Sequence, residues 1–264
     1  MPFPQHPEKH RWPALYSASD FRRYQTEHHG TAPPEPPPTV VLVFGGRWAR
    51  YLRRRFPKGP DRRTGVYREG RSTGIVHVEG PGAPFVGIVV EELAALGVNG
   101  FVIVGLAGSL RPELRLGSLV VCGKAVRDEG TSHHYQRPSR YAYPDRRLTD
   151  QLVAHLTRTG TSFLVGPSWT TDAPYRETVP EIRKYRHMGV LTVEMEASAV
   201  FAIAGHLGLR SAALFVISDH LDESGWEPRF YDTQPALEKA LHLAIRACQP
   251  PGSDRTRRVR VRHR

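Results

Sequence analysis

The chain has 264 residues, of which 39% are hydrophobic, and it carries a formal net charge of +11 with only two cysteines. This size and apolar content suit one large α/β domain and exclude a disordered chain or a small disulfide scaffold. No apolar run is long enough to cross a membrane. Cys122 and Cys248 lie in or beside apolar stretches with no secretory signal before them. We therefore expect a reducing, cytoplasmic location and no membrane partner.

The two ends of the chain differ in composition from the middle. Residues 1–38 are rich in Pro and His, and we expect a poorly ordered extension there apart from a short helix near 17–24. Residues 249–264 carry six Arg against one Asp and read as a disordered basic tail. The absence of a zinc pattern, a helix-turn-helix or an aromatic-interleaved basic stripe argues against a nucleic-acid partner. The folded domain should span 39–248.

Apolar runs and helical periodicities alternate through that domain, starting with the β-branched run at 39–44 and the Gly45-Gly46 turn that follows it. Most of the expected strands are apolar on both faces, which is typical of a sheet covered by helices on each side. We therefore predict a three-layer αβα fold with a central, mostly parallel or mixed sheet, and a ligand site where strands end. In chain order, the patterns predict strands at 39–44, 73–80, 100–110, 117–123, 162–167, 190–193 and 211–219, and helices at 47–56, 85–97, 146–158, 176–189, 194–208 and 234–247.

Three carboxylates flank the apolar unit at 193–221, VEMEASAVFAIAGHLGLRSAALFVISDHL. Glu194 and Glu196 precede its helix, and Asp219 follows its strand. Burying a carboxylate is costly unless it is paired or hydrogen-bonded, so acids beside a core suggest chemistry. The structural alternative is that the Glu residues favour a helix N-terminus and that Asp219 caps a turn.

Several stretches together resemble the purine nucleoside and uridine phosphorylase superfamily, which also contains nucleoside hydrolases. They are VEMEASAVFAIAGHLG with SDHL, and VGLAGSLRPELRLGSLVV. KAVRDEGTSHHY and WTTDAPYRET are similar to the uridine phosphorylase-like subgroup. The resemblance covers about 39–248 and implies a nucleoside phosphorylase fold. It also implies cleavage of a nucleoside N-glycosidic bond, inorganic phosphate as co-substrate, no cofactor or metal, and a homo-oligomer.

The resemblance also implies roles for the carboxylates. Glu196 corresponds to the residue that binds the ribose hydroxyls, with Met195 packed against the sugar and Glu194 beside them. Asp219 corresponds to the acid that donates a proton toward purine N7, which makes the base a better leaving group. Arg229 corresponds to the Arg that orients that acid. Because uridine phosphorylases lack an acid at this position, Asp219 favours a purine-type base.

The phosphate and base sites match the family less well. The usual phosphate ligands on the strand at 100–110 are replaced by Ile103 and Leu106. Water could therefore replace phosphate as the nucleophile, or the chain could bind nucleosides without turnover. The basic Gly-Gly-Arg loop favours an anion and therefore phosphorolysis. The candidate phosphate ligands are Gly45, Gly46, Arg47, Ser109 and Arg127, and the candidate base-binding residues are Trp169, Tyr175 and Arg176.

Overall fold

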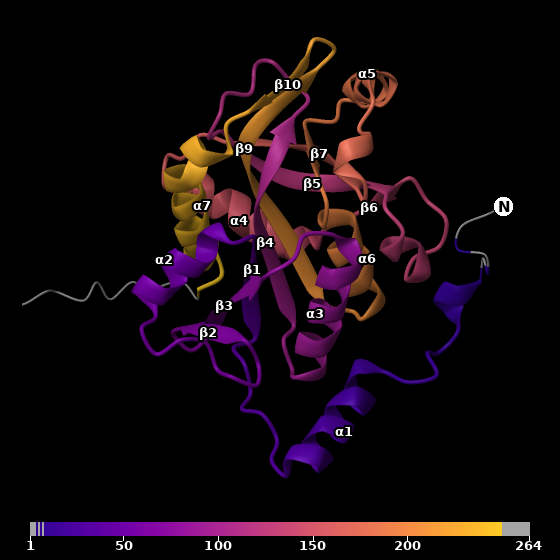
Figure 1. The fold of residues 1–264 in the computed structure, drawn as a ribbon, viewed down its shortest axis with the longest axis vertical. Coiled ribbons are helices and arrows are strands. Elements are labelled where there is room, and N and C mark those ends of the chain that lie inside the picture. Colours follow the sequence, from indigo (N-terminus) through magenta and orange to yellow (C-terminus); the bar gives the residue numbers. More distant parts are fainter. Residues whose placement is uncertain (1–3, 5, 7, 250–264) are drawn as a thin grey trace, which may run out of the picture.

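The computed structural model describes residues 4, 6 and 8–249, and its centre is a mixed β-sheet (Figure 1). The strand order is β10-β9-β5-β7-β8-β4-β1-β3-β2, with β6 paired to β5. Half of the strand pairs are parallel, and the other half are antiparallel, namely β2–β3, β4–β8, β5–β6, β5–β9 and β9–β10. The strands are β1 (Thr39–Phe44), β2 (Val66–Glu69), β3 (Thr73–Val78), β4 (Gly100–Ser109), β5 (Leu119–Asp128), β6 (Tyr141–Ala142), β7 (Leu164–Thr171), β8 (Thr192–Glu194), β9 (Arg210–Asp222) and β10 (Gly225–Pro228).

Part of the sheet closes on itself. Because β4 pairs with both β8 and β9, the strands β4, β9, β5, β7 and β8 form a closed ring. The short β8 completes this ring through only two registered pairs with β4, at the carboxyl end of that strand. The closure brings the ends of β4, β8 and β9 together at one point.

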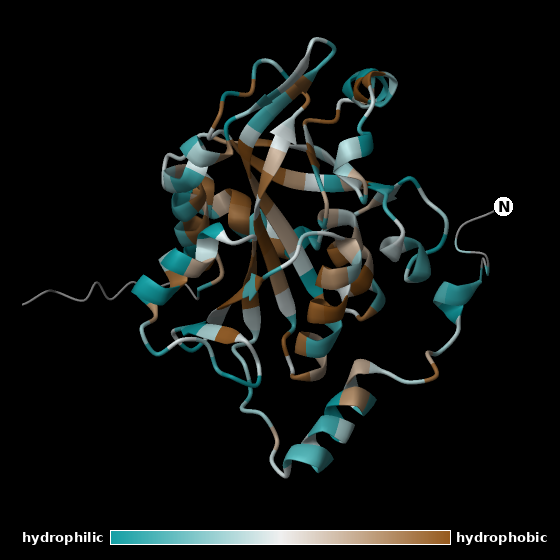
Figure 2. Cartoon of the chain, viewed as in Figure 1, coloured by the Kyte–Doolittle hydropathy of each residue, from teal (hydrophilic) through white to brown (hydrophobic). Residues whose placement is uncertain are grey.

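Helices cover both faces of the sheet, as the three-layer prediction requires. Along β1, Val40 and Leu42 enter one core cluster while Val41 and Val43 enter the other, as expected for strands whose side chains alternate between faces. The first cluster is covered by α3 and α6, and the second by α2, α4 and α7. Figure 2 shows hydrophobic residues on the strands and the inner helix faces. The helices are α1 (Ala18–His29), α2 (Arg47–Arg55), α3 (Ala83–Ala95), α4 (Arg146–Arg158), α5 (Val179–His187), α6 (Ala197–His206) and α7 (Gln234–Ala247), with short 3₁₀ turns η1 (Lys9–Arg11), η2 (Thr131–His134), η3 (Pro174–Arg176) and η4 (Phe230–Thr233).

The expected elements are present, with differences at their ends. The short strands β2, β6 and β10 were not expected, because two to four residues carry too little periodicity to stand out. Helix α6 begins at Ala197, three residues later than the predicted helix at 194–208. The chain turns at 194–196 because the Glu194 carboxylate accepts the backbone N–H groups of Glu196 and Ala197.

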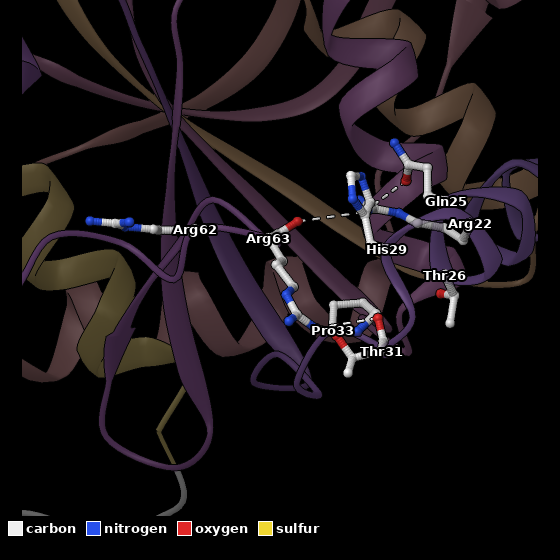
Figure 3. Close-up of a pocket in the computed structure, with 8 residues that line it drawn as sticks. All are labelled: Arg22, Gln25, Thr26, His29, Thr31, Pro33, Arg62 and Arg63. Carbon is white, nitrogen blue, oxygen red and sulfur yellow. Dashed lines mark hydrogen bonds between the residues drawn. The ribbon is translucent and has the colours of Figure 1, made fainter.

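The N-terminal extension is more ordered than its composition predicted. Helix α1 starts at a capping box, in which Ser17 and Asp20 exchange hydrogen bonds, and runs to Gly30 in the left-handed conformation. Arg22 of this helix forms an ion pair with Glu92 of α3 at 3.0 Å. A hollow of about 480 Å³ separates α1 from the segment at 59–65 (Figure 3). The basic tail expected at 249–264 lies, from residue 250 on, outside the described residues.

Candidate functional site

The site is built around Gly108 at the end of β4. Gly108 pairs with Val193 of β8 on one side and with Asp219 of β9 on the other. A Cβ atom at this position would lie only 3.0 Å from Asp219 Oδ2, so glycine leaves room for that carboxylate. The strand order therefore brings the Glu194–Glu196 segment and Asp219 to the same end of the sheet, which the chain order alone does not reveal.

Glu196 lies at the start of α6 with only 7% of its surface exposed. Its Oε1 atom accepts the backbone N–H of Gly82 at 2.6 Å. Gly82 has φ of +104°, a conformation that disfavours residues with a side chain. Burial, together with the charge of Glu194, raises the pKa of Glu196 to about 8. At neutral pH this carboxyl is therefore largely protonated. Met195 is half-buried, and its methyl group approaches Gly82.

Glu194 is held by a complete set of donors. Its carboxylate accepts from the hydroxyls of Ser168 at 3.1 Å and Thr170 at 2.6 Å. It also accepts the backbone N–H groups of Glu196 at 2.8 Å and Ala197 at 2.7 Å. Burial raises its pKa despite these donors. The predicted place of Glu194 among the ribose ligands is therefore revised: its oxygens already fix the turn between β8 and α6.

Asp219 is 5% exposed and both of its oxygens have donors. Oδ1 lies 2.5 Å from the hydroxyl of Ser218, and Oδ2 accepts the indole N–H of Trp226 at 2.8 Å. The predicted partner Arg229 instead forms an ion pair with Asp232 at 3.4 Å, and both of these side chains are exposed. The assignment of Arg229 as the orienting residue is therefore corrected, because the short β9–β10 hairpin places Trp226 against the carboxylate.

A further carboxyl, Glu177, lies in the segment between η3 and α5 and was missed in the sequence. It is half-buried, and burial together with the charge of Asp219 raises its pKa to about 7. Two acids whose titrations interact share protons as a pair. The sequence signal was obscured because Glu177 stands directly before Thr178 and Glu181, whose capping pattern explains the segment by itself.

The predicted phosphate loop lies between β1 and α2. Gly45 has φ of +83°, and Gly46 is the N-cap of α2. The backbone N–H of Gly45 already donates to the Val78 carbonyl, and those of Trp48 and Ala49 donate to the carbonyls of Gly45 and Gly46, each at 3.3 Å. The N–H groups of Gly46 and Arg47 precede the first hydrogen bonds of the helix. Arg47 is the first helical residue. Its guanidinium donates to the Phe230 carbonyl and stacks over the Tyr231 ring at 4.7 Å. With five N–H donors, an Arg held in this way keeps donors for a further anion.

The sequence of the chain matches the model of a known family. The model for the phosphorylase superfamily matches residues 40–249. The chain belongs to this superfamily.

Relatives of the chain carry the names of nucleoside phosphorylases. It is 34% identical to a guanosine phosphorylase of Halorubrum lacusprofundi, over 54% of this chain and 59% of that protein. It is 28% identical to a uridine phosphorylase of Thermococcus kodakarensis, over 70% and 69% of the two chains. It is 29% identical to a DeoD-type purine nucleoside phosphorylase of Geobacillus kaustophilus, over 69% and 78%.

Among solved structures, a uridine phosphorylase from Vibrio fischeri superposes with a TM-score of 0.62. The match covers 79% of this chain and 91% of that one at 23% identity, which supports the fold alone. The predicted family and fold are therefore confirmed. The match spans about three fifths of the Halorubrum protein, so the activity of that protein is not transferred by the comparison itself.

Two of the predicted phosphate ligands, Ser109 and Arg127, already form hydrogen bonds within the chain. Ser109 donates its hydroxyl to the Arg111 carbonyl at 2.8 Å and accepts the N–H of Arg111 at 3.0 Å. Arg127 donates to Ser132 and to the segment at 136–139 through all three of its nitrogens. Both residues hold loops, so the structure does not favour either one as a phosphate ligand. Ile103 is fully buried in the first core cluster, and Leu106 packs against the second one on the other face of the sheet.

The predicted base-binding residues lie in different environments. Trp169 is 1% exposed, donates to Asp128 at 2.8 Å and packs on Tyr185 with ring centroids 4.5 Å apart. Trp169 is therefore a core residue, and the prediction that it binds the base is corrected. Tyr175 is 98% exposed and Arg176 is also exposed, so neither forms a wall within this chain.

Neither a metal site nor a membrane-spanning helix was found in the part of the chain that the structure describes. No group of three or more His, Cys, Asp or Glu side chains is arranged to hold a metal ion there. Within the same residues, no helix has both the length and the hydropathy to cross a bilayer.

Proposed function

We propose that the chain cleaves the N-glycosidic bond of a purine nucleoside by phosphorolysis, releasing the free base and ribose 1-phosphate. The observation that carries the proposal is the pair of buried carboxyls, Glu196 and Asp219, at the strand ends on either side of Gly108. Membership of the phosphorylase superfamily supports it, as do relatives that are named phosphorylases.

In the proposed reaction, Glu196 binds the ribose hydroxyls. Its Oε1 atom is fixed by the Gly82 N–H, so the remaining lone pairs and the proton are available to the sugar. In its ionised form, which the hydroxyl donors of the sugar favour, Glu196 forms strong charge-assisted hydrogen bonds in this buried setting. These bonds strengthen as positive charge develops on the sugar ring, which places the stabilisation in the transition state. Met195 supplies an apolar surface beside the same loop.

Asp219 provides the proton for the leaving base. As the C1′–N9 bond breaks, its electron pair moves into the purine, and the proton is transferred from the carboxyl to N7. Glu177, whose pKa is raised to about 7 by burial and by the charge of Asp219, is a second acid near this position that is partly protonated at neutral pH. A phosphate oxygen forms the new bond to C1′, which gives ribose 1-phosphate without any redox change.

The N-terminus of α2 and Arg47 are the proposed phosphate site. Backbone N–H groups at the start of a helix and a guanidinium are both favourable to a phosphate dianion. In this proposal, the N-terminus of α2 and Arg47 make the phosphate contacts that the apolar residues Ile103 and Leu106 cannot make.

Proton transfer to N7 favours a purine, because pyrimidines lack that atom, and the two carboxyls favour a purine with N–H donors, such as guanine. Acidic side chains accept these N–H groups or protonate ring nitrogens, depending on their own charge. The similarity to a protein named guanosine phosphorylase supports this preference. We further propose a homo-oligomer, which light scattering of the purified chain would test.

A nucleoside panel with and without phosphate tests the function. We expect guanosine and inosine to yield free base and ribose 1-phosphate only when phosphate is present. Asp219→Asn should lower turnover by two or more orders of magnitude. Asp150→Asn, which removes an exposed carboxylate from α4, is the control and should leave turnover unchanged. Base release in phosphate-free buffer would show hydrolysis instead, and binding without any turnover would refute an enzyme.

A further inference from the structure

The β9–β10 hairpin brings an indole against the proposed acid. Its antiparallel register pairs Trp226 with Leu221 and Pro228 with Asp219. This register folds the Trp226 side chain back along β9, where Nε1 lies 2.8 Å from Asp219 Oδ2. The hydrogen bond joins a neutral donor to a carboxylate that is almost entirely shielded from water.

The two oxygens of Asp219 have partners of different kinds. Ser218, at 2.5 Å from Oδ1, is a hydroxyl that rotates and either donates or accepts a hydrogen bond. The indole of Trp226 only donates. A proton on Oδ2 would face the indole N–H directly, whereas a proton on Oδ1 is compatible with both neighbours. The contacts therefore distinguish the two oxygens before any substrate binds.

We propose that Trp226 is a positioning residue for Asp219: its N–H keeps Oδ2 an acceptor and leaves Oδ1 as the oxygen that carries the proton to the leaving base. This inference rests on the proposed phosphorolysis. Trp226 takes the position that the resemblance assigned to Arg229, which is turned toward Asp232. A neutral donor orients the carboxyl without adding a positive charge that would hold it ionised.

Packing alone does not account for Trp226. The residue is 58% exposed, and its nearest aromatic neighbour is Phe230 with ring centroids 6.0 Å apart. A large apolar ring that remains mostly in water gains little from burial. Its one buried polar contact is the bond to Asp219. Replacement by Phe keeps most of the ring and removes only the donor.

The test compares two substrates in Trp226→Phe. Guanosine needs a proton on its base as the bond breaks. 7-Methylguanosine carries a fixed positive charge on the same ring, so its base leaves without one. A hydrogen bond to a charged group corresponds to about a 10- to 100-fold effect. We expect kcat for guanosine to fall by that factor, kcat for 7-methylguanosine to change less than about threefold, and both KM values to change little.

The variant Asp219→Asn supplies the second measurement. If Trp226 acts through Asp219, then adding Trp226→Phe to Asp219→Asn should cause no further loss, and the double-mutant cycle should show full coupling. Equal losses on both substrates, additive losses in the cycle, or unchanged guanosine turnover would each overturn the role of Trp226. Failure of the wild-type chain to cleave either nucleoside would instead refute the proposed function, so the two failures are distinguishable.

Discussion

Replacing Glu196 with Gln should make the stability of the fold less sensitive to pH. The pKa of Glu196 rises from an ordinary 4.5 to about 8 in the folded chain, which corresponds to at most about 5 kcal/mol of linked free energy. Between these two values the folded chain holds a proton that the unfolded chain has released. Raising the pH therefore favours unfolding. The protonated carboxyl stabilises the fold fully below pH 4.5. This stabilisation is lost as the pH rises from 4.5 through 8.

The assay is urea unfolding of both proteins at several pH values between 5 and 9, followed by circular dichroism. The free energy of unfolding of wild type, minus that of Glu196→Gln, should fall by several kcal/mol over this range and level off above pH 8. The amide group of Gln adds a constant offset, because it does not titrate. The slope of the difference is therefore the measured quantity, and its sign is negative.

The control is Glu113→Gln, which removes an exposed carboxyl from the loop after β4 and should leave the pH dependence of wild type unchanged. A difference between wild type and Glu196→Gln that stays within about 0.5 kcal/mol from pH 5 to 9 would refute the reasoning. It would mean that water reaches Glu196 in the folded chain, contrary to its burial beside Gly82.

Three further outcomes follow from the same contacts. Trp169→Phe should lower the free energy of unfolding by about 1–3 kcal/mol, since it removes a hydrogen bond to a carboxylate, while kcat stays within twofold in steady-state assays. Arg47→Ala should raise the KM for phosphate at least tenfold with little change in the KM for nucleoside; an unchanged phosphate KM would remove Arg47 from the site. Glu177→Gln should flatten the pH dependence of kcat/KM between pH 6 and 8, because the group with a pKa near 7 is absent, and an unaltered profile would contradict the pairing with Asp219.

Local patterns in the sequence were sufficient to predict the layered fold and the family of the chain. The alternation of apolar strands with amphipathic helices predicted an αβα fold. Strands that are buried on both faces are apolar throughout, and the helices that cover them show the helical period of apolar residues. The VEME and SDHL stretches supplied the candidate acids Glu196 and Asp219, which stay a prediction, and the family resemblance, which is confirmed. A short strand such as β10 shows no such pattern in the sequence, although it supplies Trp226, which contacts Asp219.

Only the tertiary structure decided how the acids are partnered. Glu194 and Glu196 are two residues apart and chemically identical, yet the first accepts from two hydroxyls and two backbone N–H groups, and the second accepts from backbone N–H groups alone, including that of Gly82. Trp169, which was predicted to bind the base, lies in the core, whereas Trp226, for which the sequence carried no prediction, contacts Asp219. The physical reason is that hydrogen bonds and desolvation depend on neighbours across the sheet, from Gly82 to Trp226. Those neighbours are set by the ring of strands and not by distance along the chain.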